Sequence, residues 1–267
     1  MSNPHGTPIW FELNTPDADA ARDFYAAVAG WTVAPSPMAE HGGYLIASTP
    51  AGDGVGGIMT PPAEAPGFPG WVVYFGVDDV DAAAARVTEL GGAVAFGPMD
   101  IPHVGRFALV RDPQGVTFTL MRGDSPEASR AFVAMAEQPG HGVWIELATP
   151  DPDAAFAFYG ALFGFEKVGA MPMGEMGEYA FLGRGEDFRP GAVMSSATTG
   201  APARWNWYVG VPDIDAAIAT AKDRGGALLQ GPDPIPGGDY SANVADPQGF
   251  QIGLVGPRVQ NNDEGEQ

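Results

Sequence analysis

A tryptophan and a glutamate two residues apart occur twice in this chain, as Trp10-x-Glu12 and as Trp144-x-Glu146. Each glutamate stands in an otherwise apolar run that reads as a strand. A carboxylate among apolar side chains has a raised pKa, so it could accept a ligand's hydrogen bond or act as a general base. It could equally be a buried structural group that fixes the strand or a nearby loop. The tryptophans could stack on a planar ligand or simply fill space.

Cysteine and histidine offer little further chemistry. The chain has no cysteine, which excludes disulfides, thiolate metal sites and cysteine nucleophiles. His5, His41 and His141 lie in loop-like or terminal segments, and we expect them at the surface. His103 stands just before a predicted strand, where it could reach the rim of a site, but a structural role is favoured. The nearby Arg106 could meet an anionic ligand or pair with a carboxylate.

Alternation along the predicted strands indicates which side chains share a surface with the glutamates. Successive residues of a strand point to opposite faces. One face of each strand is uniformly apolar and suits packing against helices, as in Ile9, Phe11 and Leu13. The mixed faces are therefore predicted to line the ligand sites. They carry the candidate binding residues Trp10, Glu12 and Tyr74 in the first half and Trp144, Glu146, Asn206 and Tyr208 in the second.

These residues belong to a long internal repeat. Landmarks recur at an offset of 134 residues, as from Trp10 to Trp144. The same offset relates Tyr25 to Tyr159, Trp71 to Trp205, Gly91 to Gly225 and Asp112 to Asp246. A whole domain is therefore duplicated. We predict domains at residues 1–124 and 141–256, a linker at 125–140 and a flexible acidic tail at 257–267.

Each half contains the pattern of a strand, a helix and further short strands twice. The first helix is predicted to start with Thr15 as its N-cap and Pro16 at its first position. The second helix ends at Gly91 and Gly92, a normal C-terminal signal. The predicted fold class is therefore α+β, with two β-α-β-β-β units in each of two tandem domains.

Three segments carry a resemblance to a known family. They are the D-x-x-x-A-x-x-F-Y helices at 17–25 and 151–159, the segment VDDVDAAAARVTELGG, and the closing D-P-Q-G turns with the strand that follows. Together they resemble the vicinal oxygen chelate superfamily, which groups glyoxalases, bleomycin-resistance proteins and extradiol dioxygenases. The resemblance covers residues 7–122 and 141–256. It implies that paired units enclose a cup, which usually holds a divalent metal, and that the reaction varies widely within the fold.

The resemblance also implies where the metal ligands would stand, and this chain has other residues there. Those positions hold Trp10 and Trp144, Val72 and Asn206, and Thr119 and Gly253. The fourth position falls within VGGIMT or GAVMSS, neither of which contains an ionisable residue. Because divalent metals need several histidine or carboxylate ligands at one point, we expect no metal and no other cofactor.

Composition limits the class of partner. The 267 residues include 13 basic and 33 acidic ones, for a net charge of −20. Such a surface would repel a polyanion, and no basic cluster offers a docking stripe, so nucleic acid is not an expected partner. No apolar run of about 18 residues and no signal-like start is present, so we expect no membrane partner and a cytoplasmic location. Association of identical chains is left open.

The leading hypothesis is a metal-free protein that binds a small apolar or aromatic molecule in one or both cups, in the manner of detoxification or drug resistance. A second is an enzyme of the same superfamily, a lyase, isomerase or dioxygenase, that depends on a metal or uses Glu12 or Glu146 as its base. A third is a non-catalytic scaffold for a partner. The missing ligands weaken the metal enzyme, and the repeated Trp-x-Glu weakens the scaffold.

Overall fold

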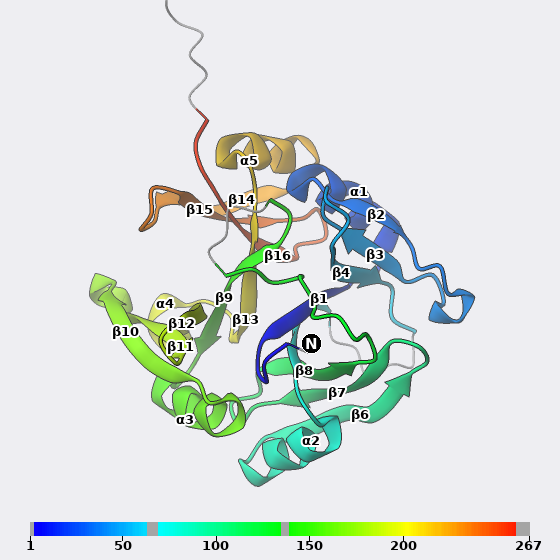
Figure 1. Ribbon diagram of the computed structural model, residues 1–267. Coiled ribbons are helices and arrows are strands. Elements are labelled where there is room, and N and C mark those ends of the chain that lie inside the picture. Colours follow the sequence, from blue (N-terminus) through cyan, green and yellow to red (C-terminus); the bar gives the residue numbers. More distant parts are fainter. Residues whose placement is uncertain (1–2, 63–68, 135–138, 260–267) are drawn as a thin grey trace, which may run out of the picture.

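The computed structural model describes residues 3–62, 69–134 and 139–259 (Figure 1). The first half contains β1 (Pro8–Asn14), α1 (Ala18–Ala29), β2 (Thr32–Pro35), η1 (Ala39–His41), β3 (Leu45–Ser48), β4 (Gly54–Met59), β5 (Gly70–Gly76), α2 (Val80–Glu89), β6 (Ala93–Ile101), β7 (Gly105–Arg111) and β8 (Thr117–Gly123). The second half contains β9 (Gly142–Thr149), α3 (Pro152–Phe163), β10 (Glu166–Pro172), η2 (Gly174–Met176), β11 (Glu178–Arg184), β12 (Phe188–Ser195), α4 (Ser196–Thr199), β13 (Arg204–Gly210), α5 (Ile214–Asp223), β14 (Ala227–Pro234), β15 (Tyr240–Ala245) and β16 (Gln251–Gly256).

Each half forms one eight-stranded sheet. The strand order is β2-β3-β4-β1-β5-β8-β7-β6 in the first half and β10-β11-β12-β9-β13-β16-β15-β14 in the second. The antiparallel pairs β1–β5 and β9–β13 stand at the centres of the sheets and join the two units of each half. The predicted α+β fold, with two β-α-β-β-β units in each half, is confirmed.

An aspartate caps the start of each of the four long helices. The residues are Asp17, Asp79, Asp151 and Asp213, and each side chain accepts a backbone N–H of the first turn. The prediction that Thr15 is the first N-cap was wrong, because α1 begins at Ala18 and the Asp17 carboxylate accepts the Ala20 N–H at 3.0 Å. The buried Thr15 hydroxyl instead donates to Gln248 of the other half at 2.7 Å. Among the described helices, none is long and apolar enough to cross a membrane.

The predicted linker at 125–140 is packed where the structure describes it. Ala131 and Phe132 are buried, and Phe132 pairs with Gly142 in a short parallel bridge. Residues 135–138 lie outside the described residues, as do residues 260–267 of the predicted flexible tail. The exact domain boundaries stay a prediction.

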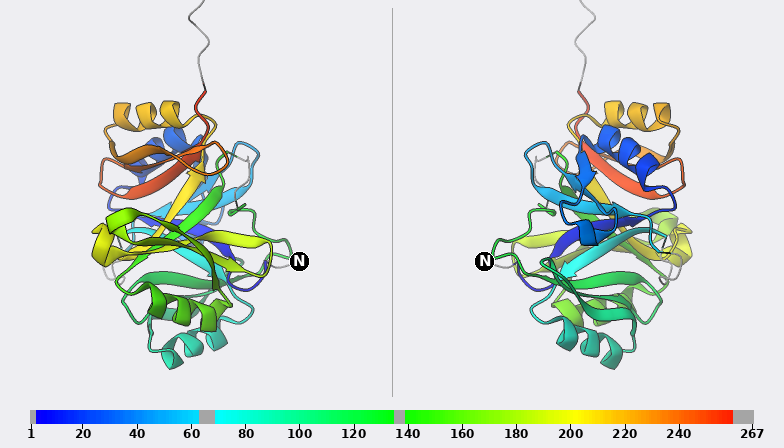
Figure 2. Two further views of the ribbon diagram at one scale, coloured as in Figure 1. Left: turned by 90° about the vertical axis from the view of Figure 1, so that its left-hand side faces the viewer. Right: turned by 90° about the vertical axis from the view of Figure 1, so that its right-hand side faces the viewer.

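The apolar strand faces of both halves meet in one core between the two sheets. The Phe11 ring stacks on Trp207 with centroids 3.9 Å apart, and Phe75 stacks on Phe163 at 5.0 Å. α1 lies beside α5 at one end of the molecule, and α2 lies beside α3 at the other (Figures 1 and 2). The sequence predicted that these faces pack against helices. In the structure they pack against the other half as well.

The landmarks of the repeat form buried hydrogen bonds between the halves. The Tyr25 hydroxyl donates to the Asp246 carboxylate at 3.0 Å and accepts from the Trp71 indole at 3.1 Å. The same arrangement, at 3.1 and 3.0 Å, recurs in the counterpart residues Tyr159, Asp112 and Trp205. The helix of each half is thus held by the D-P-Q-G turn of the other half. This explains why the chain contains these motifs twice.

The glutamine of each D-P-Q-G turn adds a second contact between the halves. Gln114 accepts the Asp151 N–H at 2.7 Å and donates to the Asp151 carbonyl at 2.9 Å. Gln248 accepts the Asp17 N–H at 3.1 Å and donates to the Asp17 carbonyl at 3.0 Å. Each glutamine therefore holds the backbone of the N-cap residue that starts the other half's first helix.

Candidate functional site

The mixed faces of the central strands point away from the shared core. We call the face of the β1–β8 sheet the first cup and that of the β9–β16 sheet the second cup. Each cup holds one of the two repeated glutamates on its central strand: Glu12 on β1 is half-buried, and Glu146 on β9 is 8% exposed.

In the first cup, a tyrosine links the repeated tryptophan and glutamate. The Tyr44 hydroxyl accepts from the Trp10 indole at 2.9 Å and donates to Glu12 Oε2 at 3.0 Å. Asn14 Nδ2 donates to Glu12 Oε1 at 3.3 Å, and the nearby Tyr74 hydroxyl lowers the pKa of Glu12. Both oxygens of Glu12 are therefore engaged. Gly57 permits this packing, because a Cβ there would lie 1.8 Å from the Tyr44 oxygen.

In the second cup, both hydroxyl donors bind the same oxygen of the glutamate. Tyr179 donates to Glu146 Oε2 at 2.8 Å, and Tyr208 donates to the same atom at 3.2 Å. The Trp144 indole donates to the Tyr179 hydroxyl at 2.8 Å, as Trp10 does in the first cup. Glu146 Oε1 accepts no hydrogen bond from the residues that the structure describes, and it is not among the fully buried unpartnered atoms.

The environment of each cup affects the proton affinity of its glutamate. Burial raises the pKa of Glu12 and of Glu146 above the ordinary value of 4.5. The tyrosine hydroxyl donors oppose this rise, because they stabilise the charged form. For Glu146, the positive charge of Arg204 also lowers the pKa. The net direction is upward for both carboxyl groups, so both are better proton acceptors than an exposed glutamate.

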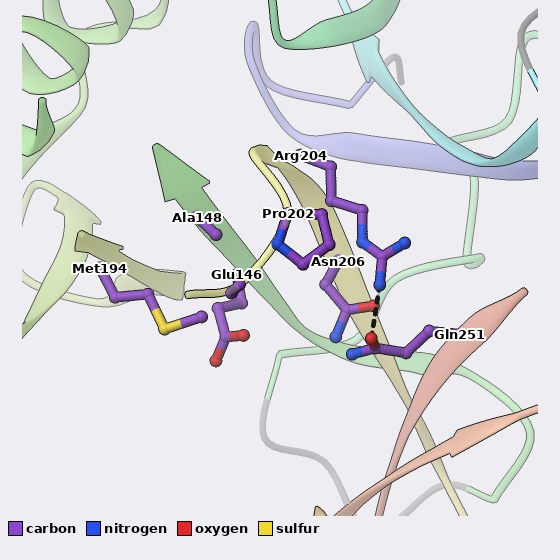
Figure 3. A pocket seen from close by; sticks show the side chains of 8 residues that line it. Glu146, Ala148, Met194, Pro202, Arg204, Asn206 and Gln251 are labelled. Carbon is purple, nitrogen blue, oxygen red and sulfur yellow. Dashed lines mark hydrogen bonds between the residues drawn. The ribbon is translucent and has the colours of Figure 1, made fainter. Parts of the chain in front are cut away.

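A small pocket opens beside Glu146 (Figure 3). Its volume of about 30 Å³ holds about two water molecules. The lining residues are Glu146, Ala148, Met194, Ala201, Pro202, Arg204, Asn206 and Gln251. The pocket therefore admits only small polar groups of a ligand, and the rest of that ligand would have to lie outside it.

Side-chain amides form one wall of this pocket. Asn243 Oδ1 accepts from Asn206 Nδ2 at 3.1 Å and from Gln251 Nε2 at 2.9 Å, and Asn243 Nδ2 donates to the Tyr208 hydroxyl at 3.3 Å. Arg204 donates to Gln251 Oε1. The network connects Arg204, which lines the pocket, to Tyr208, which donates to Glu146. It fixes the amide orientations, because reversing one amide would break several bonds.

The structure brings the predicted binding residues together within each half. Trp10 and Glu12 are joined by hydrogen bonds through Tyr44, and the Tyr74 hydroxyl lies close enough to Glu12 to lower its pKa. Trp144, Glu146 and Tyr208 join a second cluster through Tyr179, and Asn206 connects to it through Asn243. Their roles toward a ligand stay predictions.

Several site residues were missed at the level of sequence. Tyr44 and Tyr179 do not follow the offset of 134, because that offset pairs Tyr44 with Glu178. Each of the two tyrosines follows a short polar segment, and this shared position could have identified them as equivalent residues. Arg204 and Gln251 were missed although strand alternation could have found them, since they stand two residues before Asn206 and Gly253.

Arg106 and His141 contact aspartates, and His103 lies in an exposed turn. Arg106 pairs with Asp81 at 2.7 Å and with Asp100 at 2.9 Å on the exterior. Of the two alternatives given for Arg106, an anionic ligand or a carboxylate of the protein, the structure shows the second. His103 occupies an exposed turn with a φ of 62°. The expectation that His141 lies at the surface was wrong. It is 2% exposed, and its Nε2 lies 3.2 Å from Asp53 of the other half.

The donors in the cups do not fit a divalent metal. Among the described residues, no three histidine, cysteine, aspartate or glutamate side chains lie together. At Gly253, where the resemblance implies a carboxylate, a Cβ would lie 2.2 Å from the Tyr208 ring. A ligand side chain there would therefore displace Tyr208 and with it one of the donors to Glu146. The described residues of the cups therefore supply hydroxyl, indole and amide groups and not the several histidines and carboxylates that such a metal needs.

Comparisons with known proteins agree with this architecture. The family model described as Glyoxalase/Bleomycin resistance protein/Dioxygenase superfamily matches residues 7–120 and 142–254. The chain is 35% identical over 258 residues to the "Putative glyoxylase CFP32" of Mycobacterium tuberculosis, covering 96% of each chain. It is 32% identical over 265 residues to the "Anthracycline biosynthesis protein DnrV" of Streptomyces peucetius, covering 94% of this chain and 93% of the relative.

Solved structures share the fold at low sequence identity. The Mn(II)-bound glyoxalase from Novosphingobium aromaticivorans superposes with a TM-score of 0.64 at 20% identity, covering 99% of this chain and 87% of that one. The 2,2',3-trihydroxybiphenyl 1,2-dioxygenase from Sphingomonas wittichii gives a TM-score of 0.63 at 15% identity, covering 99% and 94%. These similarities concern the arrangement of the elements alone.

Proposed function

Because this chain belongs to the glyoxalase/bleomycin resistance protein/dioxygenase superfamily, we propose that it binds a small, mostly apolar or aromatic molecule in its cups without a divalent metal. The observation that carries the proposal is the state of Glu146. Two tyrosines hold its Oε2, its Oε1 has no partner among the described residues, and Glu146 lines a pocket. Such an atom is ready to accept a hydrogen bond from a hydroxyl, amine or amide of a ligand.

Aromatic side chains support the apolar part of the proposal. Trp10 and Trp144 are only half-buried, and each indole is held in place by its bond to a tyrosine hydroxyl. A fixed indole offers a flat surface to a planar ligand at little cost in side-chain entropy. The similarity to the anthracycline biosynthesis protein points the same way, since anthracyclines contain planar fused rings. A role in detoxification or resistance follows as part of this proposal, and a cytoplasmic location stays a prediction.

Catalysis with Glu146 as a general base is the second candidate. It is favoured by the raised pKa of Glu146 together with its accessible oxygen, which would allow it to take a proton from a bound molecule. Glu12 is less suited to that role, because both of its oxygens already accept hydrogen bonds. Binding comes first in either case, so one experiment tests the step that both candidates share.

The test replaces each glutamate by glutamine and measures binding of 1,4-dihydroxyanthraquinone, a planar hydroxylated probe, through quenching of tryptophan fluorescence. We expect Glu146→Gln to weaken binding by about 10- to 150-fold, the cost of one hydrogen bond to a charged acceptor. Glu12→Gln is the matched control in the first cup and should have a smaller effect. If both folded variants bind the probe as tightly as the wild type, the glutamates are structural. Failure of the wild type to bind the probe would contradict the aromatic part of the proposal.

We also expect the purified protein to hold no stoichiometric divalent metal after dialysis. The reason is the donor set described above, in which indole, amide and hydroxyl groups stand where histidine and carboxylate ligands would be needed. Elemental analysis checks this directly. A finding of about one Zn, Fe, Mn or Ni ion for each half would contradict it.

A further inference from the structure

Arg204 enters the second cup without an acidic partner. It is the first residue of β13, is half-buried, and donates to the neutral Oε1 of Gln251. No acidic residue in the described part of the chain forms an ion pair with it, although Glu146 is near enough to affect its pKa. Burial lowers the pKa of Arg204, which means that the charged form pays a desolvation cost that its present partner does not fully offset.

Arg204 is one of several arginines without an ion pair in the described part of the chain, and it differs from the others in that it lines the pocket beside Glu146. With 33 acidic and 13 basic residues, carboxylates are in excess, and Arg22, Arg106 and Arg258 each pair with at least one of them. Arg204 instead lines a pocket with Asn206 and Gln251. A guanidinium has five N–H donors in a planar fork, and one hydrogen bond to Gln251 leaves most of them free for a planar anion.

The first cup has no equivalent charge. Arg204 is paired with Ala148 across the centre of the second sheet, and in the first sheet the corresponding pair is Gly70 with Asn14. The position that carries a cation in one cup therefore carries no side chain in the other. Asn206 likewise stands where the first cup has Val72. The two cups must differ in the ligands that they accept.

We propose that the second cup, and not the first, binds a ligand that carries a carboxylate, with Arg204 as the residue that selects for it. This inference rests on the proposed function and adds the chemical class of the ligand. The carboxylate occupies the Arg204 end of the pocket, beside the Gln251 amide. A hydroxyl or amine elsewhere on the ligand donates to Glu146 Oε1, the oxygen that neither tyrosine holds. Figure 3 shows the side chains of Glu146, Arg204 and Gln251 that line the pocket. The pocket of about 30 Å³ has room for small polar groups only, and the apolar part of the ligand then lies over Met194 and Pro202.

The experiment compares 4-fluoro-3-hydroxybenzoate with its neutral amide, 4-fluoro-3-hydroxybenzamide, by broadening of the fluorine NMR signal during titration with the full chain. We expect the wild type to bind the carboxylate more tightly than the amide. In Arg204→Gln, binding of the carboxylate should fall by about 10- to 150-fold, whereas binding of the amide should fall by much less. Arg189→Gln is the matched control, because it removes the same charge from an exposed position on β12.

Three results would overturn the assignment: equal binding of the two probes by the wild type, unchanged binding of the carboxylate by folded Arg204→Gln, or no binding of either probe. None of these depends on the quinone experiment. If 1,4-dihydroxyanthraquinone still binds in a manner that requires Glu146, the proposed function stands while the anion specificity fails. If that probe fails but the carboxylate binds through Arg204, the aromatic part of the proposed function fails and the charge selection stands.

Discussion

Residues 1–134 and 139–267, produced as separate chains, are each expected to lack a stable fold and to regain one when they are mixed. The reason is the shared core: Phe11 and Phe75 of the first half stack on Trp207 and Phe163 of the second. A fragment alone would expose this aromatic surface to water and would also leave the buried Tyr25 or Tyr159 without its aspartate. Near-ultraviolet circular dichroism and sedimentation velocity of the fragments and of their mixture would measure the effect.

The control is the full chain cut by a protease at a site inserted between residues 134 and 139. Because the contacts between the halves do not depend on that peptide bond, the cut protein should sediment as one particle and keep its circular dichroism. A fragment 1–134 that is monomeric and cooperatively folded would show that each half has a sufficient core of its own. That result would contradict the interpretation of the interface as a folding core.

Trp207→Ala is expected to lower the free energy of unfolding by about 3–5 kcal/mol, the usual cost of removing a large buried aromatic ring. Trp207 is 0% exposed, stacks on Phe11, and lies with its ring centroid 5.9 Å from that of Trp31 and 5.1 Å from that of Trp71. Removing it would leave a cavity between the two sheets that rigid strands cannot close. Urea unfolding followed by far-ultraviolet circular dichroism gives the measurement.

Two further variants separate the effect of this cavity from other causes. Trp144→Ala removes the same side chain from the neighbouring strand on the cup face, where the ring is half-buried, so its cost should be clearly smaller. Trp207→Phe should recover most of the loss, because the buried Trp207 Nε1 has no hydrogen-bond partner among the described residues to be forfeited. If Trp207→Ala and Trp144→Ala lower the free energy of unfolding by the same amount, the core between the halves does not contribute more to stability than the cup face does.

The repeat made the fold predictable from the sequence. Once the offset of 134 residues placed Tyr25 and Tyr159 in equivalent helices, the alternation of apolar residues gave the strands. The sequence could not show what covers the apolar faces. Alternation assigns Phe11 to a face, but it does not distinguish a helix of the same half from the sheet of the other half. Thr15 was assigned as a cap for a similar reason, since its true partner, Gln248, lies more than two hundred residues away in the chain.

The candidate site was predictable only where it lies on the central strands. Strand alternation and the repeat both apply to regular strands. They therefore identified the candidate residues on the central strands, which are Glu12, Glu146, Tyr74 and Tyr208. Tyr44 lies in the segment that leads into β3, and Tyr179 lies in β11. A one-residue insertion in this part of the second half shifts the offset between the two tyrosines to 135 residues. Asn206 was found as a candidate in the second cup alone, because the first cup has Val72 at the matching position. The charge of Arg204 has no counterpart in the first half, so comparing the two copies could not have revealed it.

The crossed hydrogen bonds between the two halves also affect how this protein can change by mutation. Tyr25 donates to Asp246 and Tyr159 donates to Asp112. A substitution at the tyrosine in the helix of one copy would therefore leave the buried aspartate in the turn of the other copy without its hydrogen bond. Neither copy can then be deleted or replaced by an unrelated domain without opening the partner's interior. The cups lie on the opposite faces of the sheets, and the described hydrogen bonds of each cup stay within its own half. One chain can thus keep two copies for folding while each cup acquires its own ligand preference, and a second binding specificity could be selected or engineered without disturbing the first.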